Sequence, residues 1–193
     1  MSTRGEAGKW NRIYREGDHG GCEAATVLAE NRHLLPATGA ALDAACGLGA
    51  NALLLAEHGL HTSAWDISEK ALERLANSAS AKNMKLIVEQ RDIVNHPPEP
   101  ESFDVIVISR FLDRKLVKHL QEALRLDGLI FYQTFIREKQ DDWGPRNPEY
   151  RLAENELLQL FISLHIVLYR EEGIIGDRQK GFRNEAMLIA QRR

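Results

Sequence analysis

Three aspartates each stand at the end of a strand-like segment, and the first of them comes just before a pair of glycines. Asp43 lies near the end of an apolar run that starts at Gly39, and Gly47 and Gly49 come next. Glycine tolerates positive φ and has no Cβ, so a ligand can approach the backbone at such a turn. The helix expected to begin at Asn51 points its unpaired N–H groups and positive dipole end to the same place. The pattern predicts a strand, a glycine-rich turn and a helix that bind a small molecule.

Asp66 and Asp92 extend this pattern, because Asp66 ends the strand-like segment that begins with 61–65 and Asp92 follows the apolar run 84–88. Asp66 stands about where an acid ends the second strand of a dinucleotide-binding fold and binds a ribose. The carboxyl ends of parallel strands meet at one edge of the sheet, so the three acids are expected to lie together there. A carboxylate at Asp43 would repel a pyrophosphate, and it favours a cationic group such as an ammonium or a sulfonium.

These residues resemble the motifs of the class I S-adenosylmethionine-dependent methyltransferases over nearly the whole chain. The run 42–49 is similar to the first motif of that family, and Asp66 to its ribose-binding acid. Asp92 and Ile93 resemble its adenine-flanking pair, and 103–107 resembles its fourth strand. Within the family the chain looks most like the small tellurite-resistance-type and thiopurine-type enzymes. The resemblance implies a Rossmann-like three-layer α/β/α sandwich, whose mostly parallel seven-stranded sheet has a reversed strand at its C-terminal edge.

The resemblance also implies S-adenosyl-L-methionine as the cofactor, with a role for each matching residue. Asp43 would sit near the methionine ammonium, Asp66 would accept from the ribose hydroxyls, and Asp92 would accept from the adenine amine. Ile67 and Ile93 would enclose the adenine ring. The implied cofactor-binding residues are Asp43, Ala45, Gly47, Gly49, Asp66, Ile67, Asp92, Ile93 and Ser109. Structural alternatives stay open: Asp43 can cap the turn, Asp66 can open the next helix as an Asx turn, and both isoleucines can be core.

The resemblance implies that the methyl acceptor binds after the fourth strand, where Arg110 could hold an anionic group. The alternative is an ion pair of Arg110 with Asp113 or another carboxylate. Methyl transfer from a sulfonium mainly requires that the reactants be held in line, so no catalytic residue is assigned. Arg110, His19 and His119 are candidates for such a role. Aromatic residues that could wall the pocket, or merely pack, are Trp10, Tyr14, Phe111 and Trp143.

The size and composition of the chain limit the possible classes of protein. At 193 residues one domain is expected, with an N-terminal helical lid segment at 1–36 and the methyltransferase domain at 37–193. A net charge of −3 gives no basic excess for nucleic-acid binding. No apolar run suits a membrane span or a signal peptide, and two cysteines suit a reducing compartment, so a cytoplasmic location is expected. The histidines predict no metal site. A small-molecule partner is expected, and the oligomeric state stays open.

The elements that must position these residues alternate along the chain. Periodicity predicts a helical turn at 9–15 after a polar start at 1–8, and a strand from 129 to 135 followed by an irregular stretch at 137–151. That stretch is either a lid or a solvated connection. The other expected strands are 40–45, 61–65, 84–89, 103–108, 164–170 and 185–190, and the other expected helices are 24–34, 51–58, 68–80, 113–124 and 154–161.

The function predicted from the sequence is methyl transfer from S-adenosylmethionine to a small acceptor by in-line displacement. A metalloid oxyanion, a thiol or a small aromatic compound would fit a pocket built from loops. Two alternatives stay open. An NAD(P)-dependent oxidoreductase shares the glycine spacing and the acid at Asp66, although Asp43 argues against it. A non-catalytic cofactor-binding or scaffold protein is the other alternative.

Overall fold

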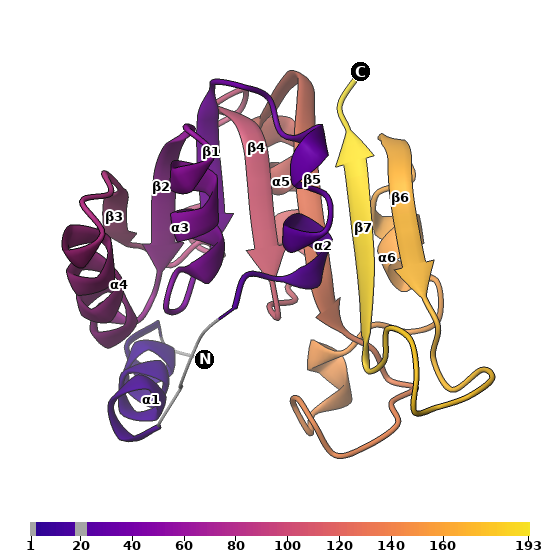
Figure 1. Ribbon diagram of the computed structural model, residues 1–193. Coiled ribbons are helices and arrows are strands. Elements are labelled where there is room, and N and C mark those ends of the chain that lie inside the picture. Colours follow the sequence, from indigo (N-terminus) through magenta and orange to yellow (C-terminus); the bar gives the residue numbers. More distant parts are fainter. Residues whose placement is uncertain (1–2, 18–22) are drawn as a thin grey trace.

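One seven-stranded sheet organises the computed structural model, which describes residues 3–17 and 23–193 (Figure 1). The strand order is β3-β2-β1-β4-β5-β7-β6. Strands β3, β2, β1, β4 and β5 are parallel to one another, and β7 runs antiparallel to both β5 and β6. The expected fold class is confirmed, and the reversed strand β7 lies one place in from the edge. The strands are β1 Ala40–Ala44, β2 His61–Asp66, β3 Ile87–Gln90, β4 Phe103–Ser109, β5 Leu124–Phe135, β6 His165–Glu171 and β7 Glu185–Gln191.

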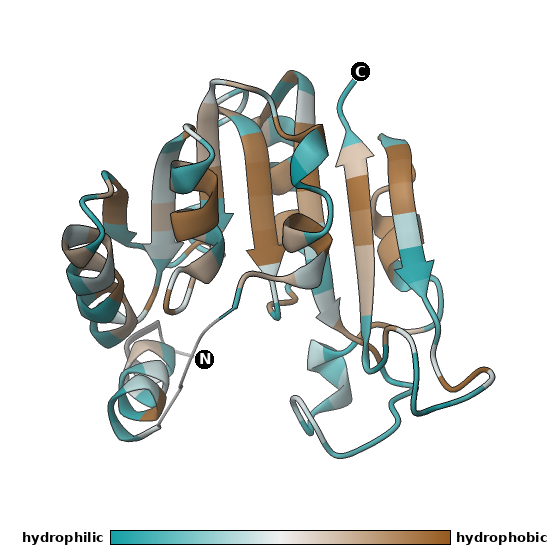
Figure 2. Ribbon diagram, in the orientation of Figure 1, coloured by the Kyte–Doolittle hydropathy of each residue, from teal (hydrophilic) through white to brown (hydrophobic). Residues whose placement is uncertain are grey.

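Helices cover both faces of this sheet and give the expected three layers (Figure 1). After the N-terminal helix, the helical elements of the described residues are α2 Thr26–Ala29, η1 Arg32–Leu34, α3 Ala50–Glu57, α4 Glu69–Ala81, α5 Leu116–Ala123, η2 Pro148–Tyr150 and α6 Glu156–Leu160. On one face, Leu28 of α2 and Leu55 of α3 pack with Val107 of β4. On the other face, Leu120 of α5 packs with Ile108 of the same strand. Alternate residues of β4 therefore enter opposite cores, as a central strand requires. Apolar residues concentrate accordingly on β4, β5 and β7 in Figure 2.

The first helix, α1 Thr3–Glu16, lies near the carboxyl edge of the sheet (Figure 1). The side-chain oxygen of Asn11 accepts hydrogen bonds from the Ser68 hydroxyl (2.7 Å) and from the Lys70 N–H (3.2 Å) at the start of α4. Arg74 donates to the carbonyl oxygen of Tyr14 (3.1 Å). The expectation of no element before residue 9 was wrong, because docking against α4 stabilises a longer helix than the local sequence indicates.

Two other elements differ from the periodicity prediction. The helix expected at 24–34 divides into α2 and η1, because Asn31 leaves the helical region and its amide donates to the Val27 carbonyl (3.0 Å). Strand β3 begins at Ile87 instead of Met84, because the Met84 N–H closes the end of α4 on the Ala79 carbonyl (2.9 Å).

None of the helices in the described ranges is both long and apolar enough to cross a membrane.

Candidate functional site

The first acid of the site, Asp43, is fully buried at the end of β1. One carboxylate oxygen accepts from the backbone N–H of Ala52 in the first turn of α3 (3.0 Å), and the other accepts from the amide of Asn51 (3.4 Å). Burial raises the pKa of Asp43 from 3.8 to about 7, although these hydrogen bonds lower it. Asp43 therefore caps the helix after the turn, and a cationic neighbour would favour its ionised form.

The second acid, Asp66, ends β2 and ties the glycine-rich turn to the next helix. One carboxylate oxygen accepts from the Gly47 N–H and the other from the Ser68 N–H, both at 2.8 Å. The hydrogen bond from the Ser68 N–H forms an Asx turn, which is the structural alternative that the sequence allowed for Asp66. A carboxylate has about four acceptor positions, so Asp66 retains capacity for a ligand hydroxyl. Burial raises the pKa of Asp66, and the three backbone N–H groups that face it lower that pKa.

The turn between these acids takes the backbone conformation that its glycines permit. Gly47 and Gly49 have φ of 53° and 75°, and Ala45 has φ of 54° despite its side chain. A Cβ at Gly47 would lie 2.6 Å from the Tyr14 hydroxyl oxygen, so α1 covers the turn through this residue. Trp10 stacks on Tyr14 with ring centroids 6.0 Å apart, and Trp10 is 36% exposed.

Two buried amides hold the start of α2 against this edge of the sheet, and sequence reasoning did not identify either. Asn51 accepts from the Ala25 N–H (2.8 Å) and donates to Ser109 (3.1 Å) as well as to Asp43. Gln133 on β5 accepts from the Val27 N–H (2.9 Å) in the same way. The available signal was an amide side chain inside an apolar stretch, because a buried amide requires hydrogen-bond partners.

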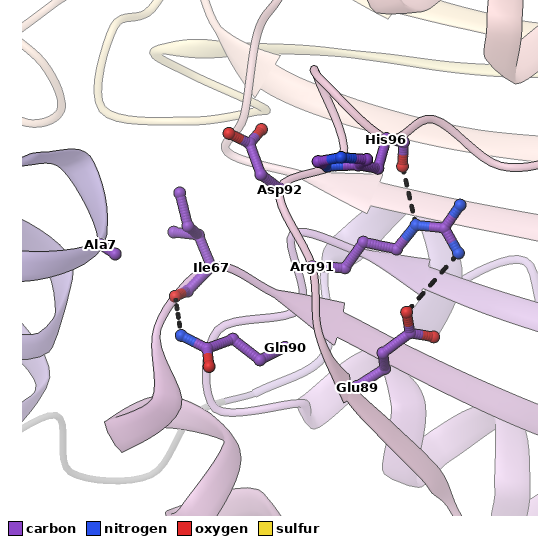
Figure 3. Close-up of a pocket in the computed structure, with 7 residues that line it drawn as sticks. All are labelled: Ala7, Ile67, Glu89, Gln90, Arg91, Asp92 and His96. Atoms are coloured by element: carbon purple, nitrogen blue, oxygen red, sulfur yellow. Dashed lines mark hydrogen bonds and ion pairs between the residues drawn. The ribbon is translucent and has the colours of Figure 1, made fainter. Parts of the chain in front are cut away.

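A pocket of about 670 Å³ opens beside the ends of β2 and β3 (Figure 3). It is lined by Ala7, Ile67, Glu89, Gln90, Arg91, Asp92 and His96. The Asp92 carboxylate accepts from the Val94 N–H (3.1 Å) and from the Asn95 amide (2.7 Å), which fixes the turn after β3. Ile67 lines the pocket, whereas Ile93 is 4% exposed and packs in the core with Trp65. The two isoleucines expected to enclose one ring therefore lie in different environments.

Arg110 follows β4 and forms an ion pair with Glu185 of β7. Its Nε donates to Glu185 at 3.1 Å, and its guanidinium carbon lies 5.0 Å from the centre of the Trp143 ring. Trp143 contacts Phe135 edge to face, with ring centroids 5.0 Å apart. The ion-pair alternative for Arg110 is realised, with Glu185 as partner instead of Asp113. Phe111 is partly buried, and its carbonyl accepts from the Tyr132 hydroxyl (3.0 Å).

The stretch 137–151 is anchored at both ends. Near its start, Asn184 accepts from the Gln140 N–H (2.7 Å) and donates to the Asp141 carboxylate (3.3 Å). The Arg114 guanidinium binds the Glu156 carboxylate and donates to the Glu149 carbonyl (2.7 Å) and to the Arg151 carbonyl (3.3 Å). These contacts hold both ends of the stretch, and Trp143 between them contacts Phe135 and Arg110.

The histidine candidates do not join this cluster. His119 lies on the exposed side of α5, with Glu122 at 3.9 Å. His19 lies outside the described residues. Within residues 3–17 and 23–193, no three histidine, cysteine or acidic side chains come together as a group that could hold a metal ion.

Comparison with known proteins gives a family match over 41–128, to a model described as a methyltransferase domain. A protein of Haemophilus influenzae named "Probable S-adenosyl-L-methionine-dependent methyltransferase TehB" is 27% identical over 148 residues. The alignment covers 72% of this chain, which spans about half the length (50%) of that relative.

Solved structures share the fold. The crystal structure of TehB from Haemophilus influenzae has a TM-score of 0.71 at 21% identity, over 96% of this chain and 67% of that one. A structure concerned with converting a disulfide bond into a thioacetal group during echinomycin biosynthesis has a TM-score of 0.73 at 22% identity, over 97% and 92% of the two chains. The family match and the TehB relative bear out the resemblance seen in the sequence, and they support S-adenosylmethionine as the cofactor.

Proposed function

We propose that this chain, which resembles the class I S-adenosylmethionine-dependent methyltransferases in sequence and fold, transfers a methyl group from S-adenosylmethionine to a small-molecule acceptor. The observation that carries the proposal is the pair of buried acids on either side of the glycine-rich turn. Asp43 and Asp66 end neighbouring parallel strands, and the Gly47 N–H donates to Asp66. An open parallel sheet binds its ligands at this edge.

The residues at this edge fit the cofactor part by part. Asp43 lies beside the turn that would receive the methionine moiety, and its charge suits an ammonium or a sulfonium. Asp66 keeps acceptor capacity for the ribose hydroxyls after its two backbone bonds. The pocket beside Ile67 and Asp92 is the space we assign to the adenine ring, with Ile67 as its apolar wall. Ile93 would then support that wall from the core and not touch the ring.

S-adenosylmethionine, when bound, supplies an activated methyl group on a sulfonium. The chain's own residues need only bind, orient and shield the reactants, so the main contribution is proximity and alignment. The Asn51 amide donates hydrogen bonds to both Asp43 and Ser109, which positions these two side chains next to the turn. Tyr14 covers the turn from outside. We propose that α1, within the N-terminal segment 1–36, acts as a lid that excludes water, while α2 of the same segment packs on the sheet.

The acceptor would enter beyond Ser109, between the loop after β4 and the stretch 137–151. Arg110, Phe111 and Trp143 come from these two segments. The classes of acceptor to screen are a metalloid oxyanion, a thiol and a small aromatic compound. We propose that the stretch 137–151 forms the outer wall of this site, because Arg114 holds it near the loop that follows β4.

Calorimetric titration with S-adenosylmethionine, S-adenosylhomocysteine and NADH tests the proposal. We expect both methionine-derived ligands to bind and NADH not to bind, followed by methyl transfer to at least one acceptor in the screen. Binding of NADH alone would favour the oxidoreductase alternative, since the turn would then accept a pyrophosphate. Tight cofactor binding without turnover of any acceptor would favour the non-catalytic alternative.

A further inference from the structure

Arg110 is held in one orientation although half of its side chain is exposed. Its backbone has φ of 55°, a conformation that side-chain-bearing residues rarely adopt, and its N–H donates to the Gln133 carbonyl (2.8 Å). Its Nε donates to Glu185 (3.1 Å), and its flat guanidinium lies over Trp143. Exposed arginines usually sample many rotamers, so this one is fixed in advance of any ligand.

The partner that fixes it is a buried carboxylate. The Glu185 side chain is 5% exposed, against 50% for Arg110, and it also accepts from the Gln133 amide (2.6 Å). Burying a carboxylate costs free energy that an ion pair with a half-exposed arginine offsets poorly. The pair is therefore better explained as a device that orients the guanidinium than as a source of stability.

The outer edge of the guanidinium is free for a ligand. In the described part of the chain, the two Nη groups of Arg110 make no hydrogen bond. A guanidinium presents parallel N–H groups that match the two oxygens of a carboxylate. Ser109, the preceding residue, is joined through Asn51 to Asp43, so this edge borders the proposed cofactor site.

We propose that the Nη edge of Arg110 binds the carboxylate of a small monoanionic acid. This acid is the methyl acceptor, through its carboxylate or through another of its groups. This inference rests on the proposed methyltransferase function and names the acceptor class of the same site. Charge favours a monoanion over a phosphate dianion, because Glu185 already offsets Arg110, and Asp43 and Asp66 stand at the same edge. Trp143 is 45% exposed, and the part of its ring that Arg110 does not cover would contact the remainder of the acid.

Ligand-observed NMR titrations with benzoate and with inorganic phosphate, each with and without S-adenosylhomocysteine, test this site. Wild-type protein should bind benzoate more tightly than phosphate. Arg110→Gln should weaken benzoate binding by about tenfold or more, the loss expected for hydrogen bonds to a charged group, while S-adenosylhomocysteine still binds. Arg110→Lys should restore only part of the loss, since an ammonium lacks the paired geometry.

Arg170 provides a matched control, because it also binds a glutamate, Glu172, through Nε (2.7 Å) and lies over the Phe182 ring at 5.6 Å. Arg170→Gln should leave benzoate binding unchanged. Glu185→Gln removes the offsetting charge, so it should shift the preference from benzoate toward phosphate, which a purely structural role of Glu185 would not do.

Two results would overturn the proposal: wild-type protein that does not bind benzoate, or equal benzoate binding by wild type and Arg110→Gln. Benzoate and S-adenosylhomocysteine together distinguish failure of this inference from failure of the proposed function. Arg110-dependent benzoate binding without S-adenosylhomocysteine binding would support the anion site and contradict the methyltransferase assignment. S-adenosylhomocysteine binding without Arg110-dependent benzoate binding would contradict the anion site and leave the proposed function standing.

Discussion

The carboxylate of Asp66 accepts a hydrogen bond from the backbone N–H of Gly47 at 2.8 Å, which joins the end of β2 to the turn after β1. The other carboxylate oxygen of Asp66 accepts from the Ser68 N–H at the start of α4. One buried side chain thus fixes the turn and the helix on either side of the proposed ribose position. Its removal should affect ligand binding and local structure together.

Asp66→Ala should weaken S-adenosylhomocysteine binding by about 1.5–3 kcal/mol, the range for hydrogen bonds to a charged group. Calorimetric titration measures this loss. Asp104→Ala is the control, because Asp104 also accepts a backbone N–H, from Ala40 (2.7 Å), but at the opposite edge of the sheet. Equal affinity of wild type and Asp66→Ala would contradict the ribose assignment.

The raised pKa of Asp43 predicts a pH dependence of stability. The native state keeps a proton that the unfolded chain loses near pH 3.8, and it releases that proton only near pH 7. Between these values the native state binds more protons, so the contribution of Asp43 to the free energy of unfolding falls as pH rises. Urea unfolding of wild type and Asp43→Asn over this range should show a flatter profile for the variant. Parallel profiles would mean that Asp43 titrates normally.

Cofactor binding should follow the opposite trend. A cationic ligand group beside Asp43 favours the ionised carboxylate, so the affinity for S-adenosylmethionine should rise as pH increases through about 7. Titrations on either side of this pH measure the effect, and Asp43→Asn serves as the variant without the ionisation. An affinity that does not change with pH in wild type would place the cation away from Asp43.

Gly47→Ala should destabilise the protein for two separable reasons. Positive φ costs a residue with a side chain roughly 1–2 kcal/mol, and the new Cβ would meet the Tyr14 hydroxyl at 2.6 Å. Adding Tyr14→Phe removes that oxygen and leaves the ring carbon at 3.5 Å, so part of the lost stability should return. Urea unfolding of the single and double variants measures the coupling.

Gly8→Ala is the control for this series, because a Cβ there meets nothing within 4 Å. It should stabilise α1 by roughly 0.5–1 kcal/mol through helix propensity alone. If Tyr14→Phe does not reduce the cost of Gly47→Ala, then α1 does not cover the turn in solution.

Asn11→Ala tests the proposed lid. The variant loses the acceptor for Ser68 and Lys70, which should release α1 from α4 at a cost of about 1 kcal/mol, as for a lost helix cap. Hydrogen exchange of residues 3–17 should quicken in Asn11→Ala but not in Arg12→Ala, whose side chain is exposed on the same helix. In wild type, S-adenosylhomocysteine should slow this exchange. Exchange that the ligand does not alter would argue against a lid.

The sequence was most informative where a single segment determines its own structure. The centre of strand β4, residues 105–108, is an unbroken apolar run and is buried on both faces. The glycines after Asp43 predict a turn with positive φ, and Gly47 and Gly49 adopt it. The acids at the strand ends follow from the alternation of strands and helices, because parallel strands end at one edge. The fold class, and the edge of the sheet where we propose that the cofactor binds, could therefore be predicted from the sequence.

Local sequence was less informative for elements whose shape depends on distant contacts. Helix α1 extends to Thr3 because Asn11 and Tyr14 bind α4, and no local signal reports such docking. Ile67 and Ile93 have the same residue type and similar positions after their strands, yet only Ile67 lines the pocket. Burial of an apolar side chain depends on the elements packed above it.

Composition and local order thus determined the parallel sheet, its glycine-rich turn and the acids beside it. Only the tertiary structure decided which buried polar groups are partners: Asn51 with Ala25, Gln133 with Val27, and Arg110 with Glu185, which lie 75 positions apart in the chain. A buried amide or carboxylate must find a hydrogen-bond partner, but residue type fixes only that requirement. The partner is whichever group the packed strands bring within about 3 Å, and that depends on the whole fold.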